Sequence, residues 1–266
     1  MTFFDKIALQ QQGGKLVGKV KKKRKASRII CDILVTLVVI GLLGTAGWLL
    51  YNEMFPNNTP VIKAQATQKI GDANEVNFDV LKTMNPDTVG WLTIKNTSID
   101  TPIVQATDND LYLYQDFWGK YDERGVPFVD MDYVGYPQNN AVVIYGHSTM
   151  NSGVKVLFDD LLNYVKDPTF IKDHGTIIYD RPEESGGKGE WEIFGVVQIE
   201  AVADYRQMAF ASDAEFIQYF KNLREASIVK NDVIVEPGDE ILTLSTCIFN
   251  THLEDGRLAI FAKRIK

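Results

Sequence analysis

The stretch EILTLSTC, residues 240–247, indicates the fold class and leads to the chemistry. Apolar and polar residues alternate along it with the period of a half-buried β-strand. The strand ends on Cys247, one of only two cysteines in the 266 residues. A strand end is where a rigid sheet can present a side chain to an incoming molecule, so this thiol is a candidate functional group. The alternative interpretation is a small buried hydrophobe, because unpaired cysteine is among the most buried residue types.

Further segments have the composition of strands, being rich in Val, Ile and aromatic residues and bounded by Gly, Pro, Asn or Asp. They cover residues 89–94, 98–105, 125–130, 140–147, 175–180, 191–203 and 257–265. Eight short strands with few helices predict a mainly β fold with peripheral helices, closed into a barrel. Helices are expected over residues 64–84, 153–165 and 213–226, and residues 181–190 are expected to form a flexible polar loop.

The N-terminal segment differs sharply in charge from the rest of the chain. Residues 1–28 hold nine Lys or Arg and one acid, a net charge of +8, which leaves −15 on the other 238 residues. An acidic body argues against nucleic acid as a partner, because phosphate binding needs basic charge on the folded face. Residues 33–52 are 20 uncharged residues, about 30 Å of helix, enough to span a bilayer. The basic flank predicts that the N-terminus lies in the cytoplasm.

The chain is therefore expected to have four parts. They are a basic cytoplasmic tail (1–32), a transmembrane anchor (33–52), a linker or helical neck (53–74) and an extracellular folded domain (75–266) that contains the candidate thiol. A cleaved signal peptide is the alternative to the anchor, but its apolar stretch is usually only about 7–15 residues long. With this topology, Cys31 lies at the cytoplasmic edge of the membrane, and Cys247 is the single exported thiol.

Cysteine chemistry needs a thiolate, a proton carrier and a donor for the developing oxyanion. Of the three histidines, His147 has the most suggestive position, because it ends the apolar strand AVVIYGH directly after a glycine. His174 and His252 lie in polar turns, where a structural role is the commoner outcome. Arg257 follows Cys247 by ten residues, so a hairpin would place it beside the thiol. An ion pair with Glu254 or Asp255 is its alternative role.

These residues together resemble a known family. The pentapeptide TLSTC (243–247), the histidine in VVIYGHSTM (142–150) and the spacing Cys-x9-Arg resemble the sortases, membrane-anchored cysteine transpeptidases of Gram-positive bacteria. The block GWLTIKNTSIDTPIVQATDNDLYL (90–113) and the helix before the last two strands are similar to class B sortases. The resemblance covers about residues 75–266 and the anchor topology.

The resemblance implies an eight-stranded sortase barrel and a two-step reaction. Cys247 would attack the threonine carbonyl in the C-terminal sorting signal of an exported protein, and the thioacyl enzyme would pass that protein to an amine. His147 would carry the protons and Arg257 would hold the oxyanion. The expected acceptor is a peptidoglycan cross-bridge, with a pilin lysine as the alternative. By similarity, the peptide groove would be lined by Asn109, Leu113 and Ser245, which could equally be turn, core and strand residues.

Two departures from the class B pattern affect the expected groove. Two residues, Ser148 and Thr149, separate the histidine from Met150, where class B members usually have one. Apolar Ile248 follows the cysteine, where many relatives carry a polar or acidic residue. The loop after His147 and the polarity of the groove are therefore expected to differ.

Two other functions remain open at the level of sequence. One is a surface cysteine protease or another cysteine-based wall enzyme, in which water or a different peptide accepts the acyl group. The other is a tethered binding module in which Cys247 is only packing. No close-paired His or Cys ligands and no phosphate-binding glycine loop occur, so neither a metal nor a cofactor is expected.

Overall fold

The computed structural model describes residues 33–47, 49–50, 59–70, 73–149, 156–248 and 252–266. The chain divides into two compact units, Met1–Asn57 and Asn58–Lys266. Residues 33–47 and 49–50 of the first unit are helical. Within the described ranges, no helix has both the length and the apolar character needed to cross a membrane. The predicted tail with Cys31, and residues 48 and 51–52 of the predicted span, lie outside those ranges.

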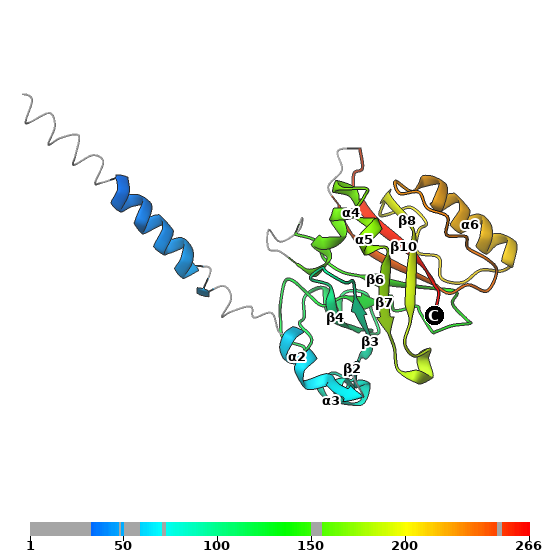
Figure 1. Ribbon diagram of the computed structural model, residues 1–266, viewed down its shortest axis with the longest axis horizontal. Helices are drawn as coiled ribbons and strands as arrows, with labels where there is room; N and C mark the ends of the chain where they lie inside the picture. Colours follow the sequence, from blue (N-terminus) through cyan, green and yellow to red (C-terminus); the bar gives the residue numbers. More distant parts are fainter. Residues whose placement is uncertain (1–32, 48, 51–58, 71–72, 150–155, 249–251) are drawn as a thin grey trace, which may run out of the picture. The chain divides into compact units, whose positions relative to one another are not determined.

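The second unit contains a closed barrel of eight strands among its described residues (Figure 1). Around the barrel the order is β10-β8-β7-β3-β4-β5-β6-β9. The β4–β5 and β6–β9 pairs are parallel and the other pairs are antiparallel. The strands are β3 (Thr88–Thr93), β4 (Asp100–Val104), β5 (Phe128–Val129), β6 (Ala141–Tyr145), β7 (Thr176–Asp180), β8 (Glu190–Glu200), β9 (Ile241–Cys247) and β10 (Gly256–Arg264). The predicted eight-stranded barrel is confirmed.

Short helices and one hairpin surround the barrel. They are α2 (Thr59–Ala66), β1 (Thr67–Ile70), β2 (Ala73–Val76), α3 (Phe78–Met84), η1 (Leu111–Leu113), η2 (Leu157–Leu162), α4 (Asn163–Lys166), α5 (Ile171–His174), η3 (Glu183–Ser185) and α6 (Asp213–Ala226). The helix α6 has the bounds that the sequence predicts. Its N-cap forms locally, because the Ser212 hydroxyl accepts a hydrogen bond from the Glu215 amide at 3.2 Å, while the Glu215 carboxylate accepts from the Ala211 amide at 2.7 Å.

The single helix predicted over residues 64–84 is wrong. The segment contains the end of α2, the antiparallel β1–β2 pair and then α3. Asn77 starts α3 as its N-cap, since its side chain accepts a hydrogen bond from the Val80 amide at 3.1 Å. The helix predicted over 153–165 is also inaccurate, because its described part consists of η2 followed by α4.

Alternation along the strands produces two apolar layers around β9. Leu242 and Leu244 lie in the cluster inside the barrel. Ile241 lies in a second cluster, where the outer face of β8, β9 and β10 packs under Phe216 and Phe220 of α6. Odd-numbered residues of β9 therefore face outward, and even-numbered ones face inward. A third cluster packs α2 and α3 against β3 and β4.

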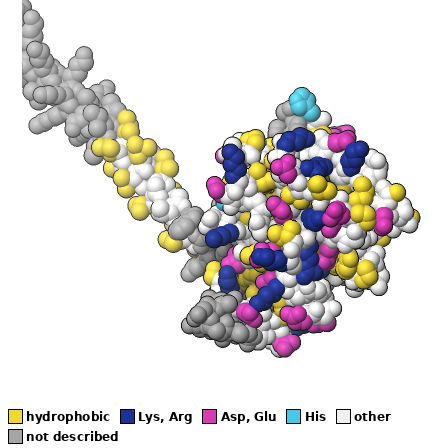
Figure 2. Space-filling model, turned by 45° about the vertical axis from the view of Figure 1, so that its right-hand side comes forward, with side chains coloured by type: hydrophobic (Ala, Val, Ile, Leu, Met, Phe, Trp, Pro, Cys, Tyr) yellow, Lys and Arg dark blue, Asp and Glu magenta, His cyan; other side chains and the backbone are white. Residues whose placement is uncertain are grey.

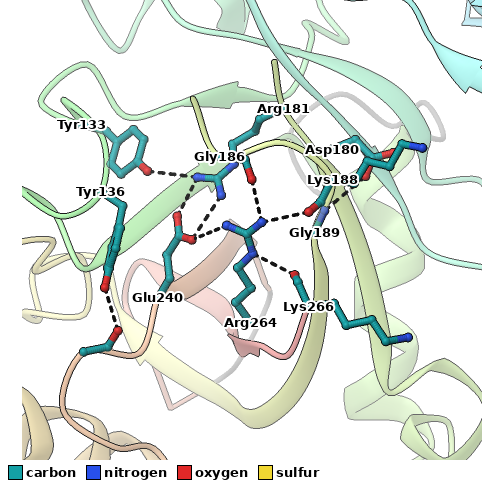
Figure 3. Close-up of polar contacts among 11 residues, drawn as sticks. Tyr133, Tyr136, Asp180, Arg181, Gly186, Lys188, Gly189, Glu240, Arg264 and Lys266 are labelled. Carbon is teal, nitrogen blue, oxygen red and sulfur yellow. Dashed lines mark hydrogen bonds and ion pairs between the residues drawn. The ribbon is translucent and has the colours of Figure 1, made fainter. Parts of the chain in front are cut away.

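A buried ion network holds the end of the barrel where β9 begins (Figure 3). The Glu240 carboxylate accepts hydrogen bonds from Arg181 Nη1 at 2.6 Å and from Arg264 Nη1 at 2.9 Å. Arg264 Nη2 also donates to the carbonyl oxygens of Gly186 and Lys188, at 2.6 Å and 2.8 Å. The predicted polar loop 181–190 is thus hydrogen-bonded to β10 and includes η3.

The surface of the described residues carries both signs of charge. Figure 2 shows one face, on which acidic and basic side chains are interspersed with hydrophobic ones. On this face, the negative charge of the body is not gathered into a patch of a single sign.

Candidate active site

The barrel places β9 between β6 and β10, and this order brings the three predicted catalytic residues to one end. In the parallel β6–β9 pair, Tyr145 lies opposite Ser245. In the antiparallel β9–β10 pair, Arg257 lies opposite Cys247. The predicted hairpin that puts the arginine beside the thiol is confirmed. Because parallel strands advance together, His147 and Cys247 lie two residues further along the same pair.

The same register puts these residues on the outer face of the barrel. Cys247 shares its face with Ile241, which packs under α6, because strand residues two apart point the same way. Arg257 lies directly opposite the cysteine and therefore shares this face. Cys247 is half-buried and forms no disulfide.

Two hydrogen bonds tie the chain around His147 to β9. The Gly146 amide donates to the Ser245 carbonyl at 3.1 Å, and the Ser148 hydroxyl donates to the Cys247 carbonyl at 2.8 Å. Gly146 is required here because a Cβ would lie 2.5 Å from the ring of buried Phe158. The glycine of the GH pair thus lets the chain pass close to the core before it reaches the histidine.

The longer loop after His147 is anchored by its two polar residues, Ser148 and Thr149. Ser148 is fully buried through its bond to β9. The Thr149 amide and hydroxyl both donate to the Asp159 carboxylate, the amide at 2.6 Å. Asp159 also accepts from the Val156 amide at 3.0 Å, at the start of η2. The departure from the class B spacing therefore fixes the loop ends to β9 and η2, whereas Met150 lies outside the described residues.

The imidazole of His147 is positioned by a backbone carbonyl. Its Nε2 lies 2.9 Å from the Leu113 carbonyl oxygen, at the end of η1. Since a carbonyl oxygen only accepts, this bond holds a proton on Nε2 and leaves Nδ1 as the nitrogen that can exchange one. The ring of Tyr114 stands beside it, with 6.3 Å between the ring centroids. The histidine is half-buried.

The sequence left two alternatives for Arg257, a place beside Cys247 or an ion pair with a nearby acid, and the structure shows both. Its guanidinium forms an ion pair with Asp255, in which Nη2 donates to Oδ2 at 3.3 Å. Burial lowers the pKa of Arg257, but the hydrogen bond to Asp255 and the electrostatic interaction with nearby Cys247 outweigh burial and raise it. A guanidinium has five donors, so an ion pair on one side leaves N–H groups for an oxyanion.

Two of the predicted groove residues border these three side chains. Leu113 supplies the carbonyl that holds His147, and its own side chain is half-buried. Ser245 precedes Cys247 by two residues on the same face. Its side chain is 2% exposed, with its Oγ 3.0 Å from the Tyr205 hydroxyl.

The third predicted groove residue, Asn109, is connected to Tyr145 through Asp130. Its Oδ1 accepts from the Met131 amide at 2.8 Å, and its Nδ2 donates to Asp130 at 3.4 Å. Asp130 in turn accepts from the Tyr145 hydroxyl at 2.6 Å. Burial first, and then this bond, raises the pKa of Tyr145, so the phenol stays protonated as a donor.

Sequence reasoning missed Tyr145, which lies opposite Ser245 on β6, and buried Tyr205, whose hydroxyl contacts the Ser245 side chain. Tyr145 could have been found, because it precedes His147 by two residues and so shares its face if the strand continues. Tyr205 has no such local signal, since it lies in the segment between β8 and α6. Only the packing of that segment over β9 brings it to the site.

The other two histidines are placed differently. The ring of His174 stacks on Phe170 with 3.8 Å between centroids, and its Nδ1 lies 3.0 Å from the Phe170 carbonyl oxygen. The Tyr164 hydroxyl donates to the His174 carbonyl at 2.6 Å, so this residue has the structural role predicted for it. His252 is exposed in the loop between β9 and β10.

Comparison with known proteins gives consistent matches over most of the chain. Sortase B of Listeria monocytogenes is 33% identical over 242 residues, which cover 86% of this chain and 95% of that protein. The crystal structure of sortase B from B. anthracis superposes with a TM-score of 0.67 at 28% identity, over 82% of this chain and 99% of that one. The Staphylococcus aureus sortase B–substrate complex gives a TM-score of 0.63 at 29% identity, over 71% and 84%. No family model matches the chain.

Proposed function

The chain belongs to the class B sortase family, and from this premise we propose that it anchors exported proteins to the cell wall. In this proposal it cleaves a C-terminal sorting signal after threonine and transfers the protein to the amine of a peptidoglycan cross-bridge. The observation that carries the proposal is the strand register that sets Cys247 beside Arg257 and advances His147 along β6 to the same end. The likeness to a sortase B solved with a substrate supports a peptide as the donor.

The first half of the reaction breaks the peptide bond. The Cys247 thiolate attacks the threonine carbonyl carbon, and the carbonyl oxygen takes the negative charge. Arg257 lies across from the cysteine and donates to that oxygen. The C–N bond then breaks, and the departing amine takes a proton from His147. A thioester to Cys247 remains, and the imidazole is neutral.

The second half reverses these roles. An acceptor amine attacks the thioester carbonyl and gives its proton to His147, and the C–S bond breaks to restore the thiolate. With Nε2 held by the Leu113 carbonyl, Nδ1 is the nitrogen that takes and returns this proton. The guanidinium stays charged through both halves, because the pKa of Arg257 is raised further above its ordinary high value.

The proposal is tested by mass spectrometry of residues 58–266 incubated with sorting-signal peptides. We expect an acyl adduct on Cys247 whose mass ends at threonine, and its release when an oligoglycine or a diamino-acid cross-bridge peptide is added. Release by a pilin lysine peptide alone would point to pilus assembly instead. Release by water at the same rate with or without amine would identify a protease.

We propose further that residues 33–52 anchor the enzyme in the membrane, with residues 1–32 in the cytoplasm and the catalytic domain outside. The uncharged sequence after a basic flank supports this, as does the helical state of residues 33–47. In fractionated cells we expect the full-length protein in the membrane fraction, with the body digested by external protease in protoplasts. A soluble mature form that starts near residue 53 would contradict the anchor.

The role of Arg257 can be separated from its ion pair. Replacement of Arg257 by Ala is expected to lower kcat/KM for thioacyl formation by about 10²–10³-fold, as loss of one oxyanion donor does. Arg257→Lys keeps the charge but loses the planar fork, so an intermediate loss is expected. Acylation of a fluorogenic sorting peptide gives the measurement.

Asp255→Asn provides the matched control for this prediction. It removes the carboxylate from Arg257 but leaves the guanidinium opposite Cys247. We expect kcat/KM within about threefold of wild type, since exposed ion pairs contribute little. A loss as large as that of Arg257→Ala would show that the arginine acts only through the ion pair.

A further inference from the structure

A surface depression of about 470 Å³ adjoins the candidate active site. Its walls come from η1 and the segment around it. The lining residues are Asp108, Asp110, Leu111, Tyr114, Gln115 and Tyr121. Two of them are acidic, two are aromatic and none is basic. None of these residues was part of the groove expected from the sequence, although the expected groove residues Asn109 and Leu113 are their neighbours along the chain.

The depression is coupled to His147 through η1. Leu111 lines the depression, and two residues later the Leu113 carbonyl holds Nε2 of His147 at 2.9 Å. Tyr114 lies between the two sites, because it lines the depression and its ring centroid is 6.3 Å from that of the imidazole. A molecule bound in the depression would therefore be separated from His147 by the ring of Tyr114.

The carboxylates and rings of this depression suit a cation. The Asp108 side chain accepts hydrogen bonds from the amides of Leu111 at 2.7 Å and Asp110 at 2.8 Å, which lower its pKa and keep it ionised. Asp110 is exposed. Tyr114 and Tyr121 are exposed by 53% and 69%, so their ring faces are open to a ligand. Aromatic faces and carboxylates together are a favourable environment for an ammonium group.

We propose that this depression binds the acceptor of the transfer reaction as its protonated amine. The inference rests on the function proposed above, and it names the binding site and the charge state of the second substrate. A primary amine with the pKa of lysine is almost fully protonated at neutral pH, so the nucleophile arrives as a cation. The acidic walls attract it and hold it near His147. At the edge of the depression the ammonium gives one proton to solvent water, and the neutral amine then attacks the thioester carbonyl. Its second proton passes to Nδ1 of His147, and the C–S bond breaks so that Cys247 departs as thiolate.

The test measures how the thioacyl enzyme divides between an amine and water. The amine probe is Nα-acetyl-lysinamide, and the neutral comparison is hydroxylamine, which is mostly uncharged at pH 7.5. Asp110→Asn is expected to raise the lysinamide concentration that gives equal transfer and hydrolysis about 3–10-fold at low salt, and Asp110→Lys is expected to raise it more. The corresponding concentration of hydroxylamine should change less than twofold.

Asp232→Asn is the matched control, because Asp232 is an exposed aspartate in the loop after α6 and outside the depression. It removes the same charge and should leave both concentrations unchanged. The inference would be overturned if the thioacyl form of Asp110→Lys partitioned between lysinamide and water as wild type does. It would also be overturned if this variant lost reactivity toward lysinamide and hydroxylamine equally. That result leaves the proposed function standing as long as an acyl adduct forms on Cys247. A wild-type enzyme without the adduct would overturn both.

Discussion

Replacement of Cys247 by Ala is expected to abolish thioacyl formation while the barrel stays folded. The loss should be on the order of 10⁴-fold or more, since removal of the nucleophile leaves only binding and oxyanion stabilisation. The fold should survive because Cys247 is half-buried at a strand end and forms no disulfide. Intact-mass spectrometry with a sorting peptide measures the adduct, and thermal unfolding by circular dichroism measures stability.

Cys247→Ser distinguishes nucleophile loss from lost packing. Serine has nearly the size of cysteine but is a much weaker nucleophile without a strong base, so we expect its activity to be close to that of the alanine variant. Alkylation adds an independent readout, because a half-exposed thiol in the folded protein should react with iodoacetamide and lose activity in parallel. A Cys247→Ala enzyme that still transfers peptide would refute the assignment. So would a thiol that reacts only after unfolding, which is the behaviour of a binding module with a structural cysteine.

Replacement of Glu240 by Ala is expected to cause the largest loss of stability, about 3–5 kcal/mol. Glu240 is the anion between Arg181 and Arg264, and the side chains of Glu240 and Arg181 are only 7% and 3% exposed (Figure 3). Without the carboxylate, the buried Arg181 guanidinium keeps its charge but loses its counter-ion. For a domain of this size the melting temperature should fall by about 6–20 °C.

An exposed ion pair supplies the control for Glu240. Glu184 pairs with Lys82 at 3.2 Å, but its side chain is 69% exposed. Glu184→Ala should therefore cost less than about 1 kcal/mol. Glu240→Gln should fall between the two, because the amide oxygen keeps one acceptor without the charge. Equal melting temperatures for Glu240→Ala and Glu184→Ala would show that water or a local rearrangement compensates the buried guanidinium.

Local sequence signals predicted the parts of the fold that depend on neighbouring residues. Helix α6 was placed to the residue because Ser212 and Glu215 form its cap within one turn. The β9–β10 hairpin was predicted because its two strands are separated by a short loop. The helix over 64–84 failed because the sequence there contains Gly71 and Asp72, a common turn pair, and because β1 and β2 satisfy each other's backbone groups.

The buried ion network around Glu240 is a second feature that local sequence signals did not predict. Arg181 and Glu240 are 59 residues apart; Arg181 opens the loop predicted over 181–190, and Glu240 is the charged first residue of the strand predicted over 240–247. Their burial follows from the closure of the barrel, which brings the end of β7 against the start of β9 and the end of β10. No local pattern distinguishes a charge that will be buried with a partner from one that stays in solvent.

By itself, the sequence determined the eight strands, the reactive residue types and the pairing of Cys247 with Arg257, because these depend on alternation and short separation. Only the tertiary structure decided that His147 joins them. A residue 100 positions away along the chain comes to the same end of the barrel as the thiol through the parallel β6–β9 pair, whose register is set by packing on both faces at once. A one-residue slip in that pair would turn the imidazole to the other side of the sheet, and no local pattern specifies such a non-local register.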